Sequence, residues 1–494
     1  MPWLTKSRFL SGLQCQKRLW FEIHQPLEEE VEPGPAVLQG RSFDEVVQRL
    51  HPGVVISREA GMSAAIAETE RLLLLGGALV PTVIYQPAFR SGDLAVIADV
   101  LRRAPAGFEL IEVKATTAVK ETHIPDVAFQ ALVLRRAGLP VQGMFIGHVN
   151  NQFVLKRLGR YEGILTEAEV TDEVMASLPT VADQATECQR IIQQPWVPTK
   201  EVGDHCFTPY DCPFIGRCHR DLPVGPEYHV DLLPRSGKVT HALIEDGYDD
   251  LRDVPAGRLT NAVHLRVLDA TVTGTPYFDV AATMELRGFA PPFSYLDFET
   301  INMAVPEVIG THPYEQVPFQ WSVHVERSAR DISHAEFLAI ESFGDFRAMA
   351  LALITALPAD GPVFAYNASF ERGVLDRLAD LAPEYAAGLN AIAQRLFDLL
   401  TVTRRAYYHR DMQGSWSIKN VMPTIAASLN YDLMGEVQGG GGAQSAFLEL
   451  RDPGTSPERV AELRAALLGY CKHDTWVMVV LRRFLCGEPL GLSG

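Results

Sequence analysis

The sequence predicts an α/β protein made of two successive α/β blocks. The chain has 494 residues, which is too long for one ordinary hydrophobic core and indicates two or three domains. Helical patterns alternate with short apolar strands over residues 1–222 and again over 291–494, as in α/β folds. Residues 223–290 are rich in Pro, Gly and Asp and are expected to link the blocks. Within this linker, residues 240–260 fit either a helix-hairpin-helix or a plain linker helix.

The composition is that of a globular protein from a reducing compartment. Hydrophobic residues make up 47% and charged residues 21% of the chain, as in ordinary globular domains. Lys6 and Arg8 break any apolar run at the N-terminus, so no secretion signal is visible. The longest uncharged stretch, residues 72–89, contains two glycines and two prolines and is no membrane span. Seven cysteines form no disulfide framework, so we expect a cytoplasmic protein with no membrane partner.

The first block shows helical spacing, then β-branched runs, then a helix closed by glycine. Alanine and leucine recur at helical spacing after Gly61, and valine and isoleucine dominate the runs that follow. The expected elements are a helix over 61–75, strands over 78–89, 94–103 and 108–115, a helix over 126–138 and a strand over 141–150.

Three polar residues interrupt the strands of this block. Glu112 and Lys114 are two apart and therefore share one strand face, and Asp99 lies on the strand before them. Two carboxylates can hold Mg²⁺, and a lysine beside them can stabilise charge on a phosphate under attack. The alternative is a cross-strand salt bridge.

This pattern resembles the PD-(D/E)XK nucleases, above all their RecB-type branch, which includes CRISPR-associated exonucleases. The resemblance implies a restriction-endonuclease-like domain over 1–222 in which Asp99 and Glu112 bind metal. Lys114 and Gln130, in the following helix, would complete the catalytic set. The acidic or histidine position that the family carries on its first helix would be Glu45 or His51.

Four cysteines form a second pattern. Cys206, Cys212 and Cys218 are each separated by five residues, and Cys15 lies far upstream. In a reduced protein this indicates thiolate ligation of zinc or of an iron–sulfur cluster, with His205 and His219 available to a mixed zinc site, or else free thiols. The resemblance to RecB-type nucleases with one N-terminal and three later cysteines implies a [4Fe–4S] cluster that joins the two ends of the domain. We expect Cys188, Cys471 and Cys486 to be ordinary buried residues.

The second block begins with a strand and follows the same alternation. The expected elements are strands over 293–301 and 318–326, a helix over 343–357, a strand over 361–367 and a helix over 368–381. The four glycines at 439–442 are expected to form a mobile loop. No phosphate-binding G-x-x-x-x-G-K-[ST] motif is present, so no ATP motor is expected.

A strand of this block carries two acidic residues. In YLDFET, Asp297 and Glu299 share one strand face, and like charges so placed are unfavourable unless a cation lies between them. The alternative is a solvated strand end. Glu371 lies four residues after Asn367, and Asp474 four after Tyr470, each pair on one helical face. The four carboxylates could hold two metal ions about 4 Å apart, with Tyr470 positioning the attacking water.

This order resembles the DEDD exonucleases of the DnaQ-like, RNase H-fold superfamily, in the variant that carries tyrosine. The resemblance implies an RNase H-like domain over 291–494 whose metal ligands are Asp297, Glu299, Glu371 and Asp474. Glu371 departs from the family, which usually has aspartate there. The ligand could instead be Asp376, Asp380 or Asp398, or the site could be weak or inactive.

A last stretch mixes cations with aromatic residues. Arg404, Arg405, Arg410 and Lys419 are interleaved with Tyr407, Tyr408 and Trp416. Such a mixture can hold phosphates and stack bases. The alternative is a solvated helix end with buried rings.

The chain as a whole resembles bacterial fusions of a RecB-like iron–sulfur nuclease with a C-terminal exonuclease-like domain of unassigned function. We therefore expect a metal-dependent nuclease, an exonuclease on single-stranded or end-containing DNA that uses Mg²⁺ or Mn²⁺, in repair, CRISPR-related processing or phage defence, with protein partners in those pathways. The alternatives are an RNA-processing exonuclease, one working site only, or a non-catalytic nucleic-acid-binding subunit. The net charge of −17 disfavours a DNA coat protein but not a nuclease, whose metal ligands are themselves acidic.

Overall fold

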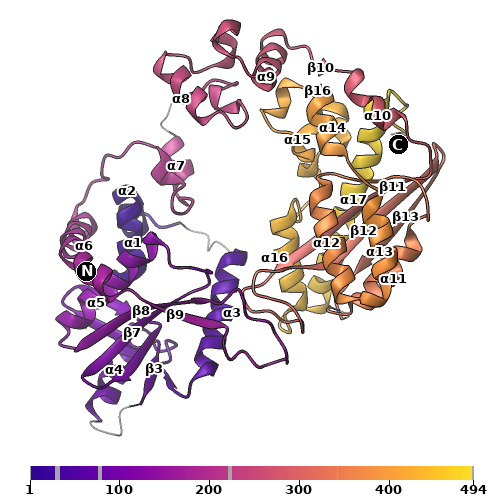
Figure 1. Cartoon of the computed structure of the whole chain (residues 1–494). Coiled ribbons are helices and arrows are strands. Elements are labelled where there is room, and N and C mark those ends of the chain that lie inside the picture. The colour runs from indigo at the N-terminus through magenta and orange to yellow at the C-terminus, as the bar shows by residue number, and fades with distance from the viewer. Residues whose placement is uncertain (1, 28–33, 76–80, 221–224, 342, 492–494) are drawn as a thin grey trace. The chain divides into compact units, whose positions relative to one another are not determined.

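Helices and strands alternate along the chain in the computed structural model, which confirms the predicted α/β class (Figure 1). The structure describes residues 2–27, 34–75, 81–220, 225–341 and 343–491. The chain divides into two units. Unit 1 comprises Met1–Pro223 and Met303–Glu315, and unit 2 comprises Val224–Asn302 and Gln316–Gly494. The predicted boundary at 222–223 lies outside the described residues.

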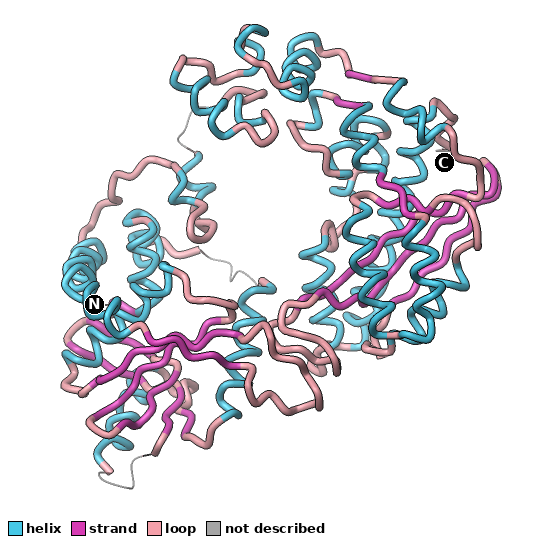
Figure 2. The backbone as a smooth tube through the Cα atoms, viewed as in Figure 1, coloured by secondary structure: helices cyan, strands magenta, loops and turns pink. Residues whose placement is uncertain are grey.

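Unit 1 contains a six-stranded mixed sheet and a smaller three-stranded sheet. Figure 2 colours the strands magenta and the helices cyan. The larger sheet runs, in spatial order, β2 (Val54–Val55), β3 (Val83–Tyr85), β6 (Val100–Ala104), β7 (Gly107–Lys114), β8 (Val141–Val149) and β9 (Leu165–Glu169). The smaller sheet runs β1 (Leu4–Thr5), β5 (Leu94–Ile97) and β4 (Ala88–Ser91). The helices are α1 (Lys6–Gln14), α2 (Gln16–His24), α3 (Pro35–Leu50), α4 (Met62–Leu74), α5 (Ile124–Arg136), α6 (Thr171–Gln193) and α7 (Ile215–His219).

The predicted strand over 94–103 is wrong in one informative respect. It is two strands, β5 and β6, which belong to different sheets. Ala98 and Asp99 lie between the two strands and belong to neither. The Val113 amide donates a hydrogen bond of 2.9 Å to the Asp99 carboxylate. Asp99 therefore lies at a corner beside β7.

Helix α5 forms where the sequence predicts it. A proline in its first turn suits the fixed φ of a helix start, and Gly138, with φ of 85°, follows its end. Every residue of α5 from Asp126 to Leu134 is buried, which explains how polar Gln130 comes to lie inside the unit.

Residues 225–290 are not a simple linker, because they fold with unit 2. They form α8 (Gly237–Glu245), α9 (Ala262–Thr273) and β10 (Tyr277–Phe278), which pairs with β16 (Tyr407–Tyr408). Gly247, with φ of 85°, makes the turn after α8. The residues that follow it form two short 3-10 turns, so the helix-hairpin-helix is not formed.

Unit 2 is centred on a five-stranded sheet in the order β13-β12-β11-β14-β15. Its strands are β11 (Phe293–Asn302), β12 (Gln316–Ser328), β13 (Asp331–Leu338), β14 (Val363–Ala365) and β15 (Leu396–Asp398). Its helices are α10 (Met284–Arg287), α11 (Phe346–Ala356), α12 (Ala368–Leu381), α13 (Ala386–Gln394), α14 (Leu399–Ala406), α15 (Ile418–Ile425), α16 (Gly440–Arg451) and α17 (Pro457–Cys486). In Figure 1, α11–α13 lie together on one side of this sheet, and α16 and α17 lie on the other.

The central strand β11 pairs antiparallel with β12 and parallel with β14. Its residues are buried on both faces, as expected of a central strand. Helix α17 packs against β11 and β12. Ser456 caps its start, and Gly487, with φ of 72°, ends it. These two elements bring residues 297–299 and 470–474 together.

Among the described residues, no helix has the length and apolar character needed to cross a membrane.

Candidate functional site

Three carboxylates of unit 2 converge on one point. One ligand oxygen from each of Asp297, Glu299 and Asp474 lies within 4.8 Å of the other two. We call these residues the acidic cluster. Asp297 and Glu299 reach it from the same face of β11, as their spacing predicts, and a break in the β11–β12 register follows Glu299. Within the described ranges, no other three Asp, Glu, His or Cys side chains come this close.

Glu371 is a fourth carboxylate near the acidic cluster, outside the group of three that lies within 4.8 Å. It is buried in the first turn of α12, and its Oε2 atom has no hydrogen-bond partner among the described residues. Its charge helps to raise the pKa values of both Asp297 and Glu299. Asp376 and Asp380 are exposed on the same helix. Of the four candidates for this position, Glu371 is thus buried beside the cluster, while two point to solvent.

Asp398, the remaining candidate, has another role. Its Oδ1 accepts hydrogen bonds from the backbone N–H groups of Leu400 (2.9 Å) and Asn367 (3.1 Å), and its Oδ2 accepts one from the Thr401 hydroxyl (2.7 Å). Asp398 therefore caps α14 and holds the start of α12.

Burial and mutual repulsion shift the pKa values at the acidic cluster. Burial and then the Asp474 charge raise the pKa of Asp297 well above its usual range and that of Glu299 to about 8. Burial also raises the pKa of Glu371 to about 8 and that of Asp474 to about 6. Carboxylates in such a setting either take up protons or bind a cation.

Two tyrosines and a lysine border the acidic cluster. Tyr431 donates a hydrogen bond to Asp474 Oδ1, and Tyr470 also hydrogen-bonds to Asp474. The charge of Lys419 lowers the pKa values of Glu299 and Asp474. Its ammonium lies 5.6 Å from the centre of the Tyr470 ring. Sequence reasoning found Tyr470 but missed Tyr431, and it placed Lys419 only in a general basic stretch.

Cys471 also belongs to this site. Its sulfur lies 3.5 Å from Asp297 Oδ2, in position to donate an S–H hydrogen bond. Burial and then Asp297 raise the pKa of the thiol. The sequence held the signal, because Cys471 precedes Asp474 by three residues and shares its helical face.

The prediction of a mobile loop at the four glycines is wrong. Gly440 begins α16, and a Cβ atom added there would lie 3.9 Å from Glu299 Oε2. A Cβ atom on Gly439 would lie 2.6 Å from the Lys419 ammonium. A side chain at Gly439 would therefore collide with Lys419, and one at Gly440 would touch Glu299.

The predicted nuclease residues of unit 1 come together around Glu112. Its Oε1 accepts hydrogen bonds from the ammoniums of Lys6 (2.7 Å) and Lys114 (2.6 Å), and its Oε2 accepts one from the Gln130 amide (2.6 Å). Lys114 also donates to Asp126 (2.5 Å). We call this group the Glu112 site. The predicted pair of Glu112 and Lys114 is therefore a salt bridge within a larger buried network.

The charge balance at the Glu112 site is the opposite of that at the acidic cluster. Burial alone would raise the pKa of Glu112, but Lys6 and Lys114 hold it well below its usual range. Burial and then Glu112 raise the pKa of Asp99. Lys6 and Lys114 thus compensate the charge of Glu112, and a metal ion that binds Glu112 Oε1 would have to displace one of them.

Three residues of the Glu112 site were missed by sequence reasoning: Lys6, Asp126 and Asp44. Burial and then the Glu112 charge raise the pKa of Asp44 to about 6. The expected Glu45 and His51 are exposed, whereas Asp44 of α3 is the residue that interacts electrostatically with Glu112. Adjacent helical residues point about 100° apart, so an error of one residue selects the wrong face. Asp126 had a visible signal, since it lies one turn before Gln130.

The four predicted cysteine ligands lie at the ends of the unit 1 chain. Cys15 separates α1 from α2, Cys206 ends a short 3-10 turn (Asp204–Cys206), and Cys218 lies in α7. The Cys212 amide donates to the Cys206 carbonyl (2.8 Å), and both Cys15 and Cys206 act electrostatically on Cys212, whose pKa is raised mainly by burial. Among the described residues, no three of these sulfurs are close enough to share a single ion.

Comparisons with known proteins match parts of the chain. A family model described as a domain of unknown function, DUF2779, matches residues 294–417. The uncharacterized protein MG366 of Mycoplasma genitalium is 27% identical over 214 residues, which cover 39% of this chain and 31% of the relative. Its homolog in Mycoplasma pneumoniae is 26% identical over 213 residues, which cover 39% and 32%. The match thus spans about a third of the length of these curated relatives. The family match takes in Asp297 and Glu299 of the acidic cluster, and Glu371 near it, but not Asp474, and its description assigns no activity.

Proposed function

We propose that this protein is a metal-dependent nuclease and that the acidic cluster is its principal active site. One observation carries the proposal: three carboxylates meet in a buried setting, beside a fourth whose Oε2 has no partner among the described residues. Their raised pKa values indicate repulsion that a bound divalent cation would relieve. Oxygen-only ligand sets of this kind suit Mg²⁺ or Mn²⁺.

Asp297, Glu299, Glu371 and Asp474 would hold the ions. When bound, divalent ions lower the pKa of a water molecule and offset charge on a phosphate. Tyr431 and Tyr470 fix the orientation of Asp474 through their hydrogen bonds, and Tyr470 would also position the attacking water. Lys419 offers a positive charge to a substrate phosphate, and the glycines at the start of α16 leave room for a backbone.

The expected substrate is DNA, single-stranded or at ends, with the protein acting as a cytoplasmic exonuclease in repair, CRISPR-related processing or phage defence. The Glu112 site is proposed as a second hydrolytic centre, with Asp99, Glu112 and Asp44 as ligands and Lys114 stabilising charge. Cys15, Cys206, Cys212 and Cys218 are proposed to bind a [4Fe–4S] cluster, which requires four thiolates and is larger than one ion. Anaerobically purified protein should then be brown, whereas a colourless protein with stoichiometric zinc would contradict the cluster.

A cleavage assay tests the two centres separately. End-labelled single- and double-stranded DNA and RNA are incubated with Mn²⁺ and either wild type, Asp297→Asn or Lys114→Ala. We expect Asp297→Asn to slow one set of products by more than about a hundredfold, since even outer-shell residues of metal sites contribute 10–100-fold. Asp376→Asn, on the exposed face of α12, and Lys200→Ala, also exposed, are the matched controls.

The outcomes distinguish the alternatives. Loss of different products in the two variants supports two working sites, and preferential cleavage of RNA supports an RNA-processing exonuclease. If wild type prepared without oxygen cleaves nothing but binds oligonucleotides, the protein is a non-catalytic binding subunit and the proposal is wrong.

A further inference from the structure

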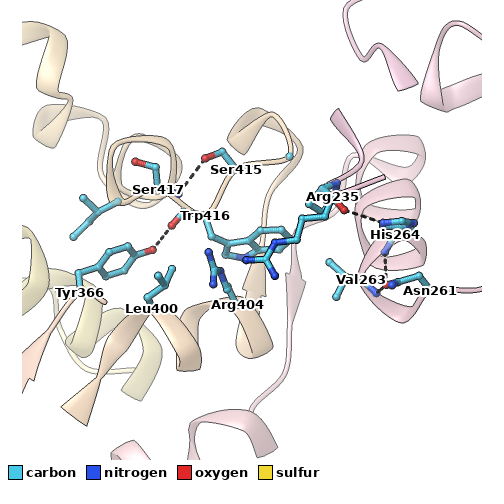
Figure 3. Close-up of a pocket in the computed structure, with 13 residues that line it drawn as sticks. Arg235, Asn261, Val263, His264, Tyr366, Leu400, Arg404, Ser415, Trp416 and Ser417 are labelled. Atoms are coloured by element: carbon cyan, nitrogen blue, oxygen red, sulfur yellow. Dashed lines mark hydrogen bonds between the residues drawn. The ribbon is translucent and has the colours of Figure 1, made fainter. Parts of the chain in front are cut away.

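Unit 2 contains a pocket that the acidic cluster does not use. Its volume is about 790 Å³, within the range of small-molecule sites. Its walls come from the loop before α8, from the start of α9, from α14 and from the loop before α15. We call it the Trp416 pocket. Figure 3 shows Arg235 and Arg404 reaching toward the Trp416 ring from different elements.

The neutral polar groups of the Trp416 pocket are largely committed to holding its walls. The Tyr366 hydroxyl donates to the Trp416 carbonyl (2.5 Å), and the Trp416 indole N–H donates to the Tyr407 carbonyl (2.8 Å). A ring nitrogen of His264 lies 3.0 Å from the Pro234 carbonyl oxygen. The first two contacts fix the loop before α15 to Tyr366 and to β16, and the third fixes α9 to the loop before α8.

The two arginines are the exception. Both are exposed, and within the described residues no ion pair or hydrogen bond of either guanidinium is found. No carboxylate lines the pocket. In a chain with a net charge of −17, two uncompensated cations in one concave site favour an anion. Arg235 also has φ of 53°, a left-handed conformation that a non-glycine residue adopts at a cost and that is concentrated at functional sites.

The aromatic rings limit what the anion is. Tyr407, Tyr408 and Trp416 are 3%, 1% and 6% exposed, which favours the alternative of buried rings over rings that stack bases. The pocket therefore offers guanidiniums and serine hydroxyls rather than an open aromatic face. This chemistry suits a phosphate, which arginine can bind through two parallel N–H groups, and it does not read base identity.

The Trp416 pocket adjoins the acidic cluster along the chain. Tyr366 of the pocket is followed by Asn367 and by α12, which carries Glu371. Ile418 of the pocket is followed by Lys419, whose charge acts on Glu299 and Asp474. The first turn of α15 thus has the pocket on one side and the cluster on the other.

We propose that the Trp416 pocket binds a backbone phosphate of a single-stranded nucleic acid, through Arg235 and Arg404, at a nucleotide away from the bond to be cleaved. This inference rests on the proposed nuclease function for the identity of the strand. It assigns the pocket a sequence-independent holding role that raises affinity without taking part in the chemistry.

The test measures binding of the full-length protein to a fluorescent oligothymidylate of about twelve nucleotides. Fluorescence anisotropy reports the binding over a range of salt concentrations, with EDTA present to keep metal ions out. The Arg235→Ala/Arg404→Ala variant should bind about tenfold more weakly or worse. The slope of log affinity against log salt should fall by about 0.7 in magnitude, since the one lost phosphate contact contributes about 0.7. Arg464→Ala, an exposed arginine on α17, should bind like wild type, and melting curves confirm that all variants are folded.

Cleavage measurements separate this inference from the proposed function. With Mn²⁺, the double variant should raise KM for the oligonucleotide and leave hydrolysis of a small thymidine phosphodiester unchanged. If wild type cleaves nothing while metal-free binding still depends on both arginines, the phosphate-binding role of the pocket is supported and the nuclease proposal is wrong. If the alanine double variant and Arg235→Glu/Arg404→Glu both bind the oligonucleotide like wild type, the proposal that the pocket binds phosphate is wrong. Equal competition by an acidic peptide would also overturn it, because the occupant would then be a protein.

Discussion

Two carboxylate groups that look alike in the sequence differ in how their charge is compensated. Glu112 has two lysine partners within 2.7 Å, whereas Lys419 is the lysine whose charge reaches Glu299 and Asp474. Lysines therefore hold the pKa of Glu112 low, whereas burial keeps the pKa values of Glu299 and Asp474 raised despite Lys419. This contrast gives each group its own test.

At Glu112, removing Lys6 should destabilise the fold. Glu112 is 1% exposed, so Lys6→Met leaves a buried carboxylate with one ammonium partner fewer. We expect the free energy of unfolding, measured in urea, to be about 2 kcal/mol lower than in wild type. This is less than the roughly 3–5 kcal/mol for breaking a fully buried pair, because the Lys6 side chain is 22% exposed. Lys200→Met, at an exposed position, is the control. Equal stability of Lys6→Met and wild type at pH 8 would show that Lys6 is not a working partner of Glu112.

At the acidic cluster, metal affinity should rise with pH. The pKa values of Glu299 and Glu371 are about 8 and that of Asp474 is about 6, so these groups hold protons at pH 6 that an ion must displace. Between pH 6 and pH 8, Mn²⁺ affinity should increase at least about tenfold per pH unit, as expected for one displaced proton. Calorimetry in a Glu112→Gln background isolates this cluster.

The control for this pH dependence is Asp376→Asn, which removes an exposed carboxylate of α12 and should keep the slope. Glu299→Gln should reduce both affinity and slope. A Mn²⁺ affinity that is independent of pH would mean that these carboxylates are not the ligands.

At the scale of elements, Asp398 should act as a helix cap and not as a metal ligand. Its carboxylate accepts the Leu400 amide and holds the Asn367 turn. Asp398→Ala should therefore destabilise unit 2 by about 1 kcal/mol, while Asp398→Asn, which keeps an acceptor oxygen, should lose a few tenths. Thermal melts with and without Mn²⁺ measure both. If Asp398→Asn instead abolished the stabilisation by Mn²⁺, Asp398 would be a ligand.

The histidines of β12 and β13 give unit 2 a further pH dependence. Burial lowers the pKa of His324 to about 3 and that of His334 to about 4. Both stay neutral in the fold, while the unfolded chain takes up protons below about pH 6.5. Stability is therefore full above that pH and should fall by about 1–2 kcal/mol per histidine by pH 5. Urea unfolding at several pH values checks this in wild type and in His324→Gln, with His241→Gln at an exposed position as the control. If the free energy of unfolding depends on pH equally in all three proteins, the prediction is contradicted.

The sequence predicted features that depend on neighbouring residues and missed those that depend on contacts between distant parts of the chain. Spacing of two on β11 and of four on α17 predicted that Asp297 and Glu299, and Tyr470 and Asp474, lie side by side, because those periodicities are local. The break at Asp99 and the helical start at Gly440 could not be read, since pairing with separate sheets and packing beside Glu299 decide them. Lys6 and Tyr431 reach their sites through contacts 106 and 43 residues away in sequence, and no local pattern marks such partners.

At the scale of the whole molecule, one connection belongs to the other unit. Residues 303–315 join β11 to β12, yet they cluster with unit 1. Ala304 and Val305 are buried in a core that includes Phe43 of α3 and Val113 of β7. The Tyr314 hydroxyl donates to the carbonyl of Ala115 (2.5 Å), the residue after Lys114. The strand that carries the acidic cluster thus continues into a segment that supports the end of β7.

Val305→Ala should therefore loosen unit 1, although Val305 lies only six residues after Glu299. Val305 is 6% exposed, and loss of two buried methyl groups should cost about 1–2 kcal/mol. Hydrogen exchange followed by mass spectrometry should show faster exchange in α3 and β7, with β13 unchanged. Val280→Ala, at a position 51% exposed, should alter neither. Faster exchange confined to β11 and β12 would mean that the connection is held by its own unit. The expected pattern would instead mean that unit 1 is complete only when the chain has been made past residue 315, so a fragment ending near 222 should be the less stable form of this domain.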